Sequence, residues 1–228
     1  MNTIKVLELF AGSRSFSKVA EEFGYKAYCT DFKSFNKIDQ VCDIFDNIWK
    51  ILKTTNEDYN FDINKLREEF GEPDIIWASP PCTTFSVASI GHHWKGGNRA
   101  YIPKTEKAKV GIKMVQKTLD IINELNPKYY YIENPRGLLR KLPVIKSVAL
   151  RRTVCYCKYG ENRMKPTDIW TNDFKWIPRE MCFNGNVNCH HEPAPRGSRT
   201  GTQGLKGNYN RSIVPYELCK EIIGGVLS

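Results

Sequence analysis

A short apolar segment that ends in two prolines constrains the fold of this chain more than any other part of its sequence. Residues 74–78 read Asp-Ile-Ile-Trp-Ala, a composition typical of a buried strand, and Pro80 and Pro81 come directly before Cys82. Because proline cannot donate a hydrogen bond to a neighbouring strand, the strand has to end there. The Cys82 thiol is therefore expected at the edge where open α/β sheets place ligands and chemistry.

The N-terminal residues have the pattern of a β-α-β unit. Residues 4–10 alternate apolar side chains before the turn at residues 11–13, residues 15–24 have helical spacing and end in glycine, and residues 26–30 form a second apolar segment. Asp31 follows the first turn by about twenty positions, the spacing that places a carboxylate against ribose hydroxyls. The turn is poor in glycine, which favours a cofactor without a pyrophosphate.

The remaining pattern extends this unit to one α/β domain. A chain of 228 residues can bury a full hydrophobic core. Apolar runs predict further strands at 41–44, 128–132, 153–159 and 167–171, and helical spacing predicts helices over 105–126 and 215–227. We predict a Rossmann-like, mostly parallel sheet with helices on both faces, formed by residues 1–228, with a small irregular Cys/His-containing insert at about 172–206.

The charge of the chain indicates a polyanionic partner. Its 34 Lys and Arg residues exceed its 25 Asp and Glu residues, for a formal net charge of +9, and such surfaces attract phosphate. The long segment 84–104 is basic and contains Trp94 and Tyr101. This composition suits a nucleic-acid contact, although a solvated basic loop has the same composition.

The sequence also bears on compartment and assembly. No apolar run approaches the ~18 residues of a membrane helix, and the first residues lack the pattern of a signal peptide. We predict a cytoplasmic or nucleoid-associated monomer without a membrane partner. In a reducing compartment, each of the eight cysteines is a buried small side chain, a metal ligand or a nucleophile.

Three of these cysteines lie close enough in sequence to a histidine pair to suggest a metal site. Cys157, Cys182 and Cys189, with His190 or His191, offer the ligand set of a structural zinc ion, and we take His190 as the imidazole ligand. Scattered reduced cysteines would give the same irregular spacing, so both interpretations stay open. Zinc would explain how a segment rich in Gly and Asn holds a shape.

A second strand ends in the same way as the strand before Cys82. Residues 128–132 run into Glu133-Asn134-Pro135, so Glu133 and Cys82 are expected at the same edge of one sheet. A cysteine and a carboxyl group at one edge can act on the same ligand as nucleophile and as acid.

These motifs, in this order, resemble those of the cytosine-C5 DNA methyltransferase family. Residues 80–86, Pro-Pro-Cys-Thr-Thr-Phe-Ser, resemble the nucleophile motif, residues 133–135 resemble its Glu-Asn-Val, and Phe10-Ala11-Gly12 resembles the first cofactor motif. Residues 159–165 resemble a shortened Gln-x-Arg-x-Arg segment, with Lys165 where an arginine is expected. The resemblance covers most of the chain, but the short insert replaces a large target-recognition domain.

The resemblance implies methyl transfer from S-adenosylmethionine to C5 of cytosine in DNA. It implies Cys82 as the nucleophile and Glu133 as the acid; we add Arg163, with Arg136 second, as the cation that favours the thiolate. A base stacked in a duplex has to be flipped out to be reached. Cofactor contacts are expected from Phe10, Ala11, Gly12, Ser13, Asp31, Phe32, Asp43, Ile44, Pro80 and Asn208.

Nucleic-acid contacts are expected from basic and polar residues around this site: Ser86, His93, Lys95, Arg99, Arg136, Lys165 and Arg196. Two alternatives stay open. The substrate is RNA or a nucleotide in the first, and in the second the chain is a nucleic-acid-binding protein that keeps the fold without turnover.

Overall fold

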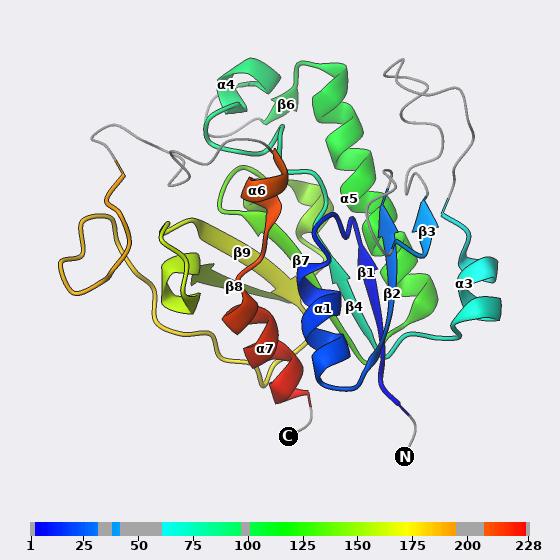
Figure 1. The fold of residues 1–228 in the computed structure, drawn as a ribbon. Helices are drawn as coiled ribbons and strands as arrows, with labels where there is room; N and C mark the ends of the chain where they lie inside the picture. Colours follow the sequence, from blue (N-terminus) through cyan, green and yellow to red (C-terminus); the bar gives the residue numbers. More distant parts are fainter. Residues whose placement is uncertain (1–2, 32–37, 42–60, 97–100, 195–207, 227–228) are drawn as a thin grey trace.

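A seven-stranded sheet forms the centre of the molecule, in the order β3-β2-β1-β4-β7-β9-β8 (Figure 1). The computed structural model describes residues 3–31, 38–41, 61–96, 101–194 and 208–226. The strands are β1 (Lys5–Leu9), β2 (Lys26–Asp31), β3 (Gln40–Val41), β4 (Ile75–Ala78), β7 (Tyr129–Pro135), β8 (Leu150–Cys155) and β9 (Pro166–Thr171). The first five of these strands are parallel, and β9 is antiparallel to both β7 and β8.

Helices cover both faces of this sheet. On one face lie α1 (Ser15–Glu22) and α7 (Tyr216–Gly225), and on the other lie α3 (Ile63–Glu69) and α5 (Glu106–Leu125) (Figure 1). Because successive strand residues point to opposite faces, Val6 and Ile75 pack under α1 and α7, whereas Leu7 and Ile76 pack under α5. The predicted Rossmann-like, mostly parallel α/β fold is confirmed.

Shorter elements complete the described part of the chain. They are α4 (Ile90–His93), the two-stranded ribbon β5 (Trp94–Lys95) and β6 (Ile102–Pro103), α6 (Asn208–Ser212), and the 3₁₀-helices η1 (Leu139–Lys141), η2 (Pro143–Ile145) and η3 (Tyr156–Tyr159). In the described residues, no helix combines the length and the apolar character that crossing a membrane requires.

Polar side chains set the first residues of two helices that frame the site. The buried Glu8 carboxylate accepts hydrogen bonds from the Phe16 and Ser17 amides, which are otherwise unpaired at the start of α1. At the start of α5, Thr105 Oγ1 accepts from the Ala108 amide, and Asn126 ends the helix in the left-handed conformation. The predicted helices over 15–24 and 105–126 are confirmed with slightly shorter bounds.

Two strand boundaries differ from the predicted ones. The strand expected to end at Ile132 continues through Pro135, because residues 133–135 pair with the antiparallel strand β9. The strand expected over 153–159 ends at Cys155, and the Tyr156 amide donates to Met164 O (2.8 Å). Cys157 therefore lies in a 3₁₀ turn. The segment 84–104, expected as a loop, contains α4 and the ribbon in its described residues.

Candidate active site

Cys82 lies in a tight turn beyond the carboxyl end of β4. Its carbonyl oxygen accepts hydrogen bonds from the Phe85 amide (3.0 Å) and the Ser86 amide (3.1 Å). Before it, the Asn134 side-chain amide donates to Pro80 O (2.8 Å), which ties the turn to the neighbouring strand β7. Residues 80–86, called the nucleophile loop from here on, are thus tied to the sheet before the thiol and closed by their own hydrogen bonds after it.

The second half of the nucleophile loop is held by Phe85, whose side chain is fully buried. Its carbonyl accepts from the Leu138 amide (2.8 Å), and the Trp94 indole donates to Thr84 O (2.7 Å). Gly137 passes so close that a Cβ atom there would lie 2.4 Å from Phe85 O. Only glycine permits this approach, because the shortest real Cβ contacts are longer.

Glu133 is buried on β7, the strand beside β4. Its Oε1 accepts a hydrogen bond from Tyr156 Oη (2.9 Å). Burial raises the pKa of the Glu133 carboxyl, while Lys165 and the hydrogen bonds from Tyr156 and Ser79 lower it. Because the Glu133 charge acts directly on the Cys82 thiol, the structure brings the predicted nucleophile and acid together.

Lys165 is a buried cation beside Cys82 and Glu133. Its side chain is buried, and its Nζ donates to Arg211 O (2.8 Å) and lies 4.3 Å from the centre of the Tyr156 ring. Burial raises the pKa of the Cys82 thiol and the Glu133 charge raises it further, whereas Lys165 and Arg211 lower it. Lys165 therefore acts on Cys82 and Glu133 from a buried position.

The two arginines predicted to support the thiolate lie elsewhere. Arg163 forms an ion pair with Glu192, and Arg136 is exposed, with its charge acting on Cys155. The sequence does mark this position, since Lys165 stands where the resembled motif has an arginine. From the sequence alone, Lys165 was expected to contact a phosphate. The order of residues does not reveal which of Arg163 and Lys165 points inward.

The predicted cofactor residues meet at the carboxyl ends of β1 and β2. Asp31 is buried and its Oδ2 accepts from the Gly12 amide (3.0 Å), while the Ala11 amide donates to Thr30 O (2.9 Å). Phe10 is half-buried with φ +59°, in the left-handed region, and packs beside α5. An aromatic face and a carboxylate thus border one turn.

The rest of this turn departs from a glycine-rich one. Arg14 has φ +56°, a conformation that glycine adopts more readily, and its guanidinium turns inward to Cys29 Sγ (3.2 Å) and Glu21. Ser13 Oγ and Ser15 Oγ lie 2.7 Å apart, and Ser15 Oγ accepts from the Val214 amide (3.1 Å). The residues before α7 therefore reach the first turn.

The profile of the C-5 cytosine-specific DNA methylases matches residues 4–147. The chain belongs to this family. The predicted family is confirmed, and with it the predicted enzyme class.

Individual relatives of this C-5 cytosine-specific DNA methylase differ in length. The Frog virus 3 (isolate Goorha) protein named "Probable DNA (cytosine-5)-methyltransferase" is 26% identical over 219 residues, which cover 91% of this chain and 92% of that protein. Orphan methyltransferase M.Rho11sI of Bacillus phage rho11s is 25% identical over 143 residues, 61% of this chain and 24% of that protein. The structure of Entamoeba histolytica methyltransferase EhMeth aligns with 79% of this chain and 57% of its own, at 16% identity and a TM-score of 0.47.

The residues predicted to contact nucleic acid differ in how exposed they are. His93 is buried, its Nδ1 lies 2.7 Å from Thr105 Oγ1, and burial lowers its pKa. Ser86 is half-buried with its Oγ 3.0 Å from Ser89 Oγ, while Lys95 and Arg136 are exposed. Five predicted site residues lie outside the described residues: Phe32, Asp43, Ile44, Arg99 and Arg196; Asn208 begins α6.

The Cys/His group of the methylase is close to the predicted one, with a different histidine. The ligand atoms of Cys157, Cys182, Cys189 and His191 all lie within 4.8 Å of one another. The predicted imidazole was that of His190, whose side chain is exposed and whose Nε2 lies 3.0 Å from Glu161 O. The sequence left His190 or His191 open, and the imidazole that lies beside the three sulfurs is that of His191.

Proposed function

We propose that this chain transfers a methyl group from S-adenosylmethionine to C5 of cytosine in DNA, with Cys82 as the nucleophile and Glu133 as the acid. The juxtaposition of three side chains carries the proposal. Cys82 follows β4, Glu133 lies on the adjacent strand β7 directly after the last residue paired with β4, and the buried Lys165 lowers the pKa of both groups.

The protein groups have complementary tasks in this reaction. The Cys82 thiolate adds to C6, and Glu133 gives its proton to N3, so that electron density moves to C5. S-adenosylmethionine, when bound, supplies the electrophilic methyl group and leaves as S-adenosylhomocysteine. Loss of the C5 proton to a base and cleavage of the C6–sulfur bond then re-form the C5–C6 double bond and return the thiolate to Cys82, and N3 gives its proton back to Glu133.

Lys165 has a positioning role in the proposal. Its positive charge favours a thiolate at Cys82 and an ionised carboxyl at Glu133, so it favours release of one proton from the pair. The Tyr156 hydroxyl holds the carboxyl group of Glu133 in place. Both partners are buried, so that water competes little with these contacts.

The residues of the first turn fit an adenosyl cofactor. The Asp31 carboxylate at the end of β2 is placed for ribose hydroxyls, and the half-buried Phe10 ring offers a face to a base. On β7, two strands from β1 in the sheet, Asn134 Oδ1 is buried without a hydrogen-bond partner among the described residues. Buried acceptors of this kind are rare, and a ligand bound at this edge would satisfy it.

Trapping of the covalent intermediate tests the proposal. A DNA duplex with 5-fluorocytosine at the target position should leave an adduct, because the fluorine cannot leave as a cation and the C6–sulfur bond is retained. Mass spectrometry should locate the adduct on Cys82 when S-adenosylmethionine is present. The Cys82→Ser variant should bind the same duplex and form no adduct.

Substrate screening completes this test. Duplexes of mixed sequence, single-stranded DNA, RNA and free nucleotides are each incubated with the wild-type chain and cofactor. Detection of 5-methylcytosine in DNA supports the proposed substrate, and modification of RNA or nucleotides alone would assign a different one. If no adduct and no modified nucleoside form with any of them, the proposed reaction is wrong.

A further inference from the structure

The segment from Ile177 to Ala194 has almost no hydrophobic core of its own. The structure describes all of these residues, and none of them belongs to a helix or strand. Only Cys182 and His191 are buried within the segment, while several apolar side chains are exposed, with Val187 at 94%. A chain segment needs buried contacts to offset the entropy lost on ordering, and here the buried groups are thiol and imidazole.

We propose that Cys157, Cys182, Cys189 and His191 bind a zinc ion that holds this segment against η3. In a tetrahedral site with Zn–S bonds of about 2.3 Å, neighbouring sulfurs are about 3.8 Å apart. Cys182 Sγ lies 3.8 Å from His191 Nδ1, and no pair of ligand atoms exceeds 4.8 Å. Small side-chain rotations therefore suffice to close the four ligands around one ion.

The identity of the ion follows from the ligands. Three thiolates and one imidazole form one of the usual ligand sets of structural zinc, and soft sulfur ligands exclude magnesium and calcium. With four protein ligands, no coordination position is left for water or substrate. The ion is therefore structural and does not take part in methyl transfer.

The burial of His191 gives a second observation. His191 is 4% exposed, and its Nδ1 faces Cys182 Sγ at 3.8 Å. A buried polar group needs a partner, and the group that faces this ring nitrogen is a sulfur that would bind the same ion. The neighbouring His190, by contrast, is exposed and has a backbone partner.

Cys155 gives the contrast expected for a cysteine that only packs. It is fully buried, and its Sγ contacts the backbone of Cys182, with the Cys182 amide 3.4 Å away. It stands outside the group of four ligands. Cys157, two residues later, faces the other sulfurs because η3 replaces the strand at that point.

The ion would also support the active site through the chain that carries Lys165. Next to His191, Glu192 pairs with Arg163, and its amide donates to Asn162 O (2.9 Å). Asn162 and Arg163 immediately precede Met164 and Lys165. Closing the metal site therefore fixes both the insert and the turn from which the lysine enters the active site.

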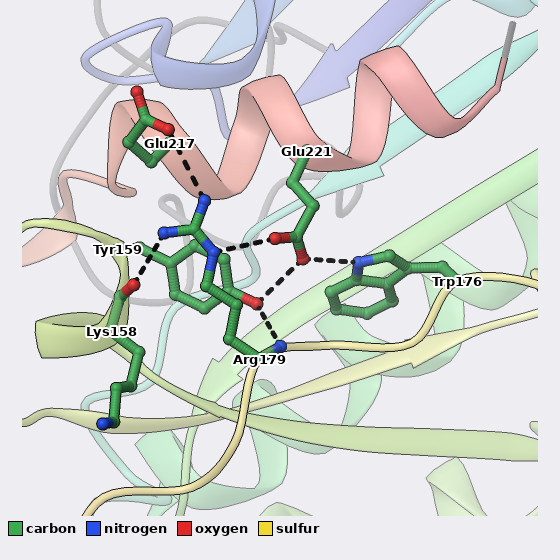
Figure 2. A network of polar contacts seen from close by, with 6 residues as sticks. All are labelled: Lys158, Tyr159, Trp176, Arg179, Glu217 and Glu221. Atoms are coloured by element: carbon green, nitrogen blue, oxygen red, sulfur yellow. Dashed lines mark hydrogen bonds and ion pairs between the residues drawn. The ribbon is translucent and has the colours of Figure 1, made fainter.

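The other end of the segment has its own anchor, which does not need metal (Figure 2). Arg179 donates to Glu221 on α7 (2.9 Å) and to Lys158 O (2.8 Å), and its guanidinium lies over the Tyr159 ring. Trp176 Nε1 also donates to Glu221 (3.1 Å). Metal loss should therefore release residues after Arg179 more than residues before it.

Metal analysis of the purified chain tests the proposal. Wild-type protein prepared under reducing conditions with zinc, and then dialysed, should contain about one zinc per chain by elemental mass spectrometry. The variants Cys182→Ser and His191→Asn should lose most of it. Cys155→Ser and His190→Asn are matched controls, each one or two residues from a ligand, and should keep it.

Limited proteolysis supplies a readout that does not depend on activity. A chelator should expose cleavage sites between residues 182 and 194 in the wild type and lower its melting temperature, and added zinc should reverse both effects. Wild-type protein that holds no zinc after dialysis would overturn the proposal. Equal metal loss in the control variants and the ligand variants would overturn it too.

Discussion

Burial makes the protonation states of Cys82 and Glu133 depend on each other. Desolvation raises the pKa of each group, the negative charge of Glu133 raises that of Cys82, and Lys165 lowers both. Between their two apparent pKa values the pair holds one proton. The proposed reaction uses the form in which this proton is on the carboxyl group and the sulfur is ionised.

Replacing Lys165 by methionine should move the pH dependence of the reaction. The neutral side chain no longer lowers the pKa of Cys82 or Glu133, so both limbs of the bell-shaped kcat/KM profile should move to higher pH. A rise of one in the pKa that governs the acidic limb should lower activity on that limb by about tenfold. Steady-state kinetics across the pH range measures the displacement of both limbs.

Lys146→Met is the matched control for this variant, because Lys146 is exposed after η2. Its profile should coincide with that of the wild type. A Lys165→Met profile that loses height at every pH without moving along the pH axis would contradict the electrostatic role and leave a packing role for the lysine.

Glu133→Gln should remove the proton donor while keeping the shape of the side chain. The loss of general acid catalysis should lower kcat by about 10²–10⁴-fold. The Tyr156 hydroxyl keeps an oxygen acceptor at this position, so the fold should persist. DNA affinity, measured by fluorescence anisotropy, should fall far less than kcat, because phosphate contacts supply most of the affinity of a protein for DNA. An unchanged kcat would exclude Glu133 as the acid.

The nucleophile loop acts as an element because its neighbours leave it little freedom. Asn134 holds Pro80, Leu138 holds Phe85, and Trp94 holds Thr84, so that three separate segments fix the turn around the thiol. Such a turn keeps the sulfur at a set distance from Glu133. Preorganisation of this kind matters for rate, since small displacements of a reacting group are costly.

Gly137→Ala should therefore act on the nucleophile loop from outside it. The new methyl group would lie 2.4 Å from Phe85 O, and since the obstacle is backbone, the loop has to move. We expect a loss in kcat of about 100-fold, the size of effect caused by a displacement near 1 Å. Circular dichroism should show retained secondary structure.

Gly91→Ala supplies the control, because a Cβ atom at Gly91 meets nothing within 4 Å. Its activity should equal that of the wild type. If Gly137→Ala were as active as Gly91→Ala, the close approach at Phe85 would have no part in positioning Cys82.

Strand periodicity predicted the order of the elements correctly, but not where two of them end. The extension of β7 through Pro135 depends on pairing with β9, which lies about thirty residues later in the chain. The end of β8 at Cys155 depends on the hydrogen bond between Tyr156 and Met164. Both boundaries result from partners that a local pattern does not contain.

At the scale of the whole molecule, the net charge of +9 favours association with DNA. The position of each basic side chain decides how much it contributes to DNA binding. Arg136 is exposed directly after β7, at the edge that carries Glu133, and its amide is bound to Pro166 O. Arg151 is exposed on β8, where it pairs with Trp170 near the far end of β9. The two arginines thus differ mainly in their distance from the active edge.

Arg136→Gln should weaken DNA binding to a similar extent for all sequences and reduce the salt dependence of the affinity. Removal of one phosphate contact lowers the slope of log K against log salt by about one. Binding isotherms at several salt concentrations give this slope. Arg151→Gln should leave it unchanged, and equal slopes for the two variants would show that DNA does not approach along this edge.

Local patterns in the sequence were sufficient to predict the strands before Cys82 and Glu133, the edge that these strands share, and the turn after β1. Strand period, helix spacing and proline act on neighbouring residues, so a local pattern contains them. Only the tertiary structure decides that Lys165, and not Arg163, faces Cys82, and that His191, and not His190, lies beside the three sulfurs. Charges and metal ligands act through distance in space, and the direction of a side chain depends on turns whose partners are remote in sequence.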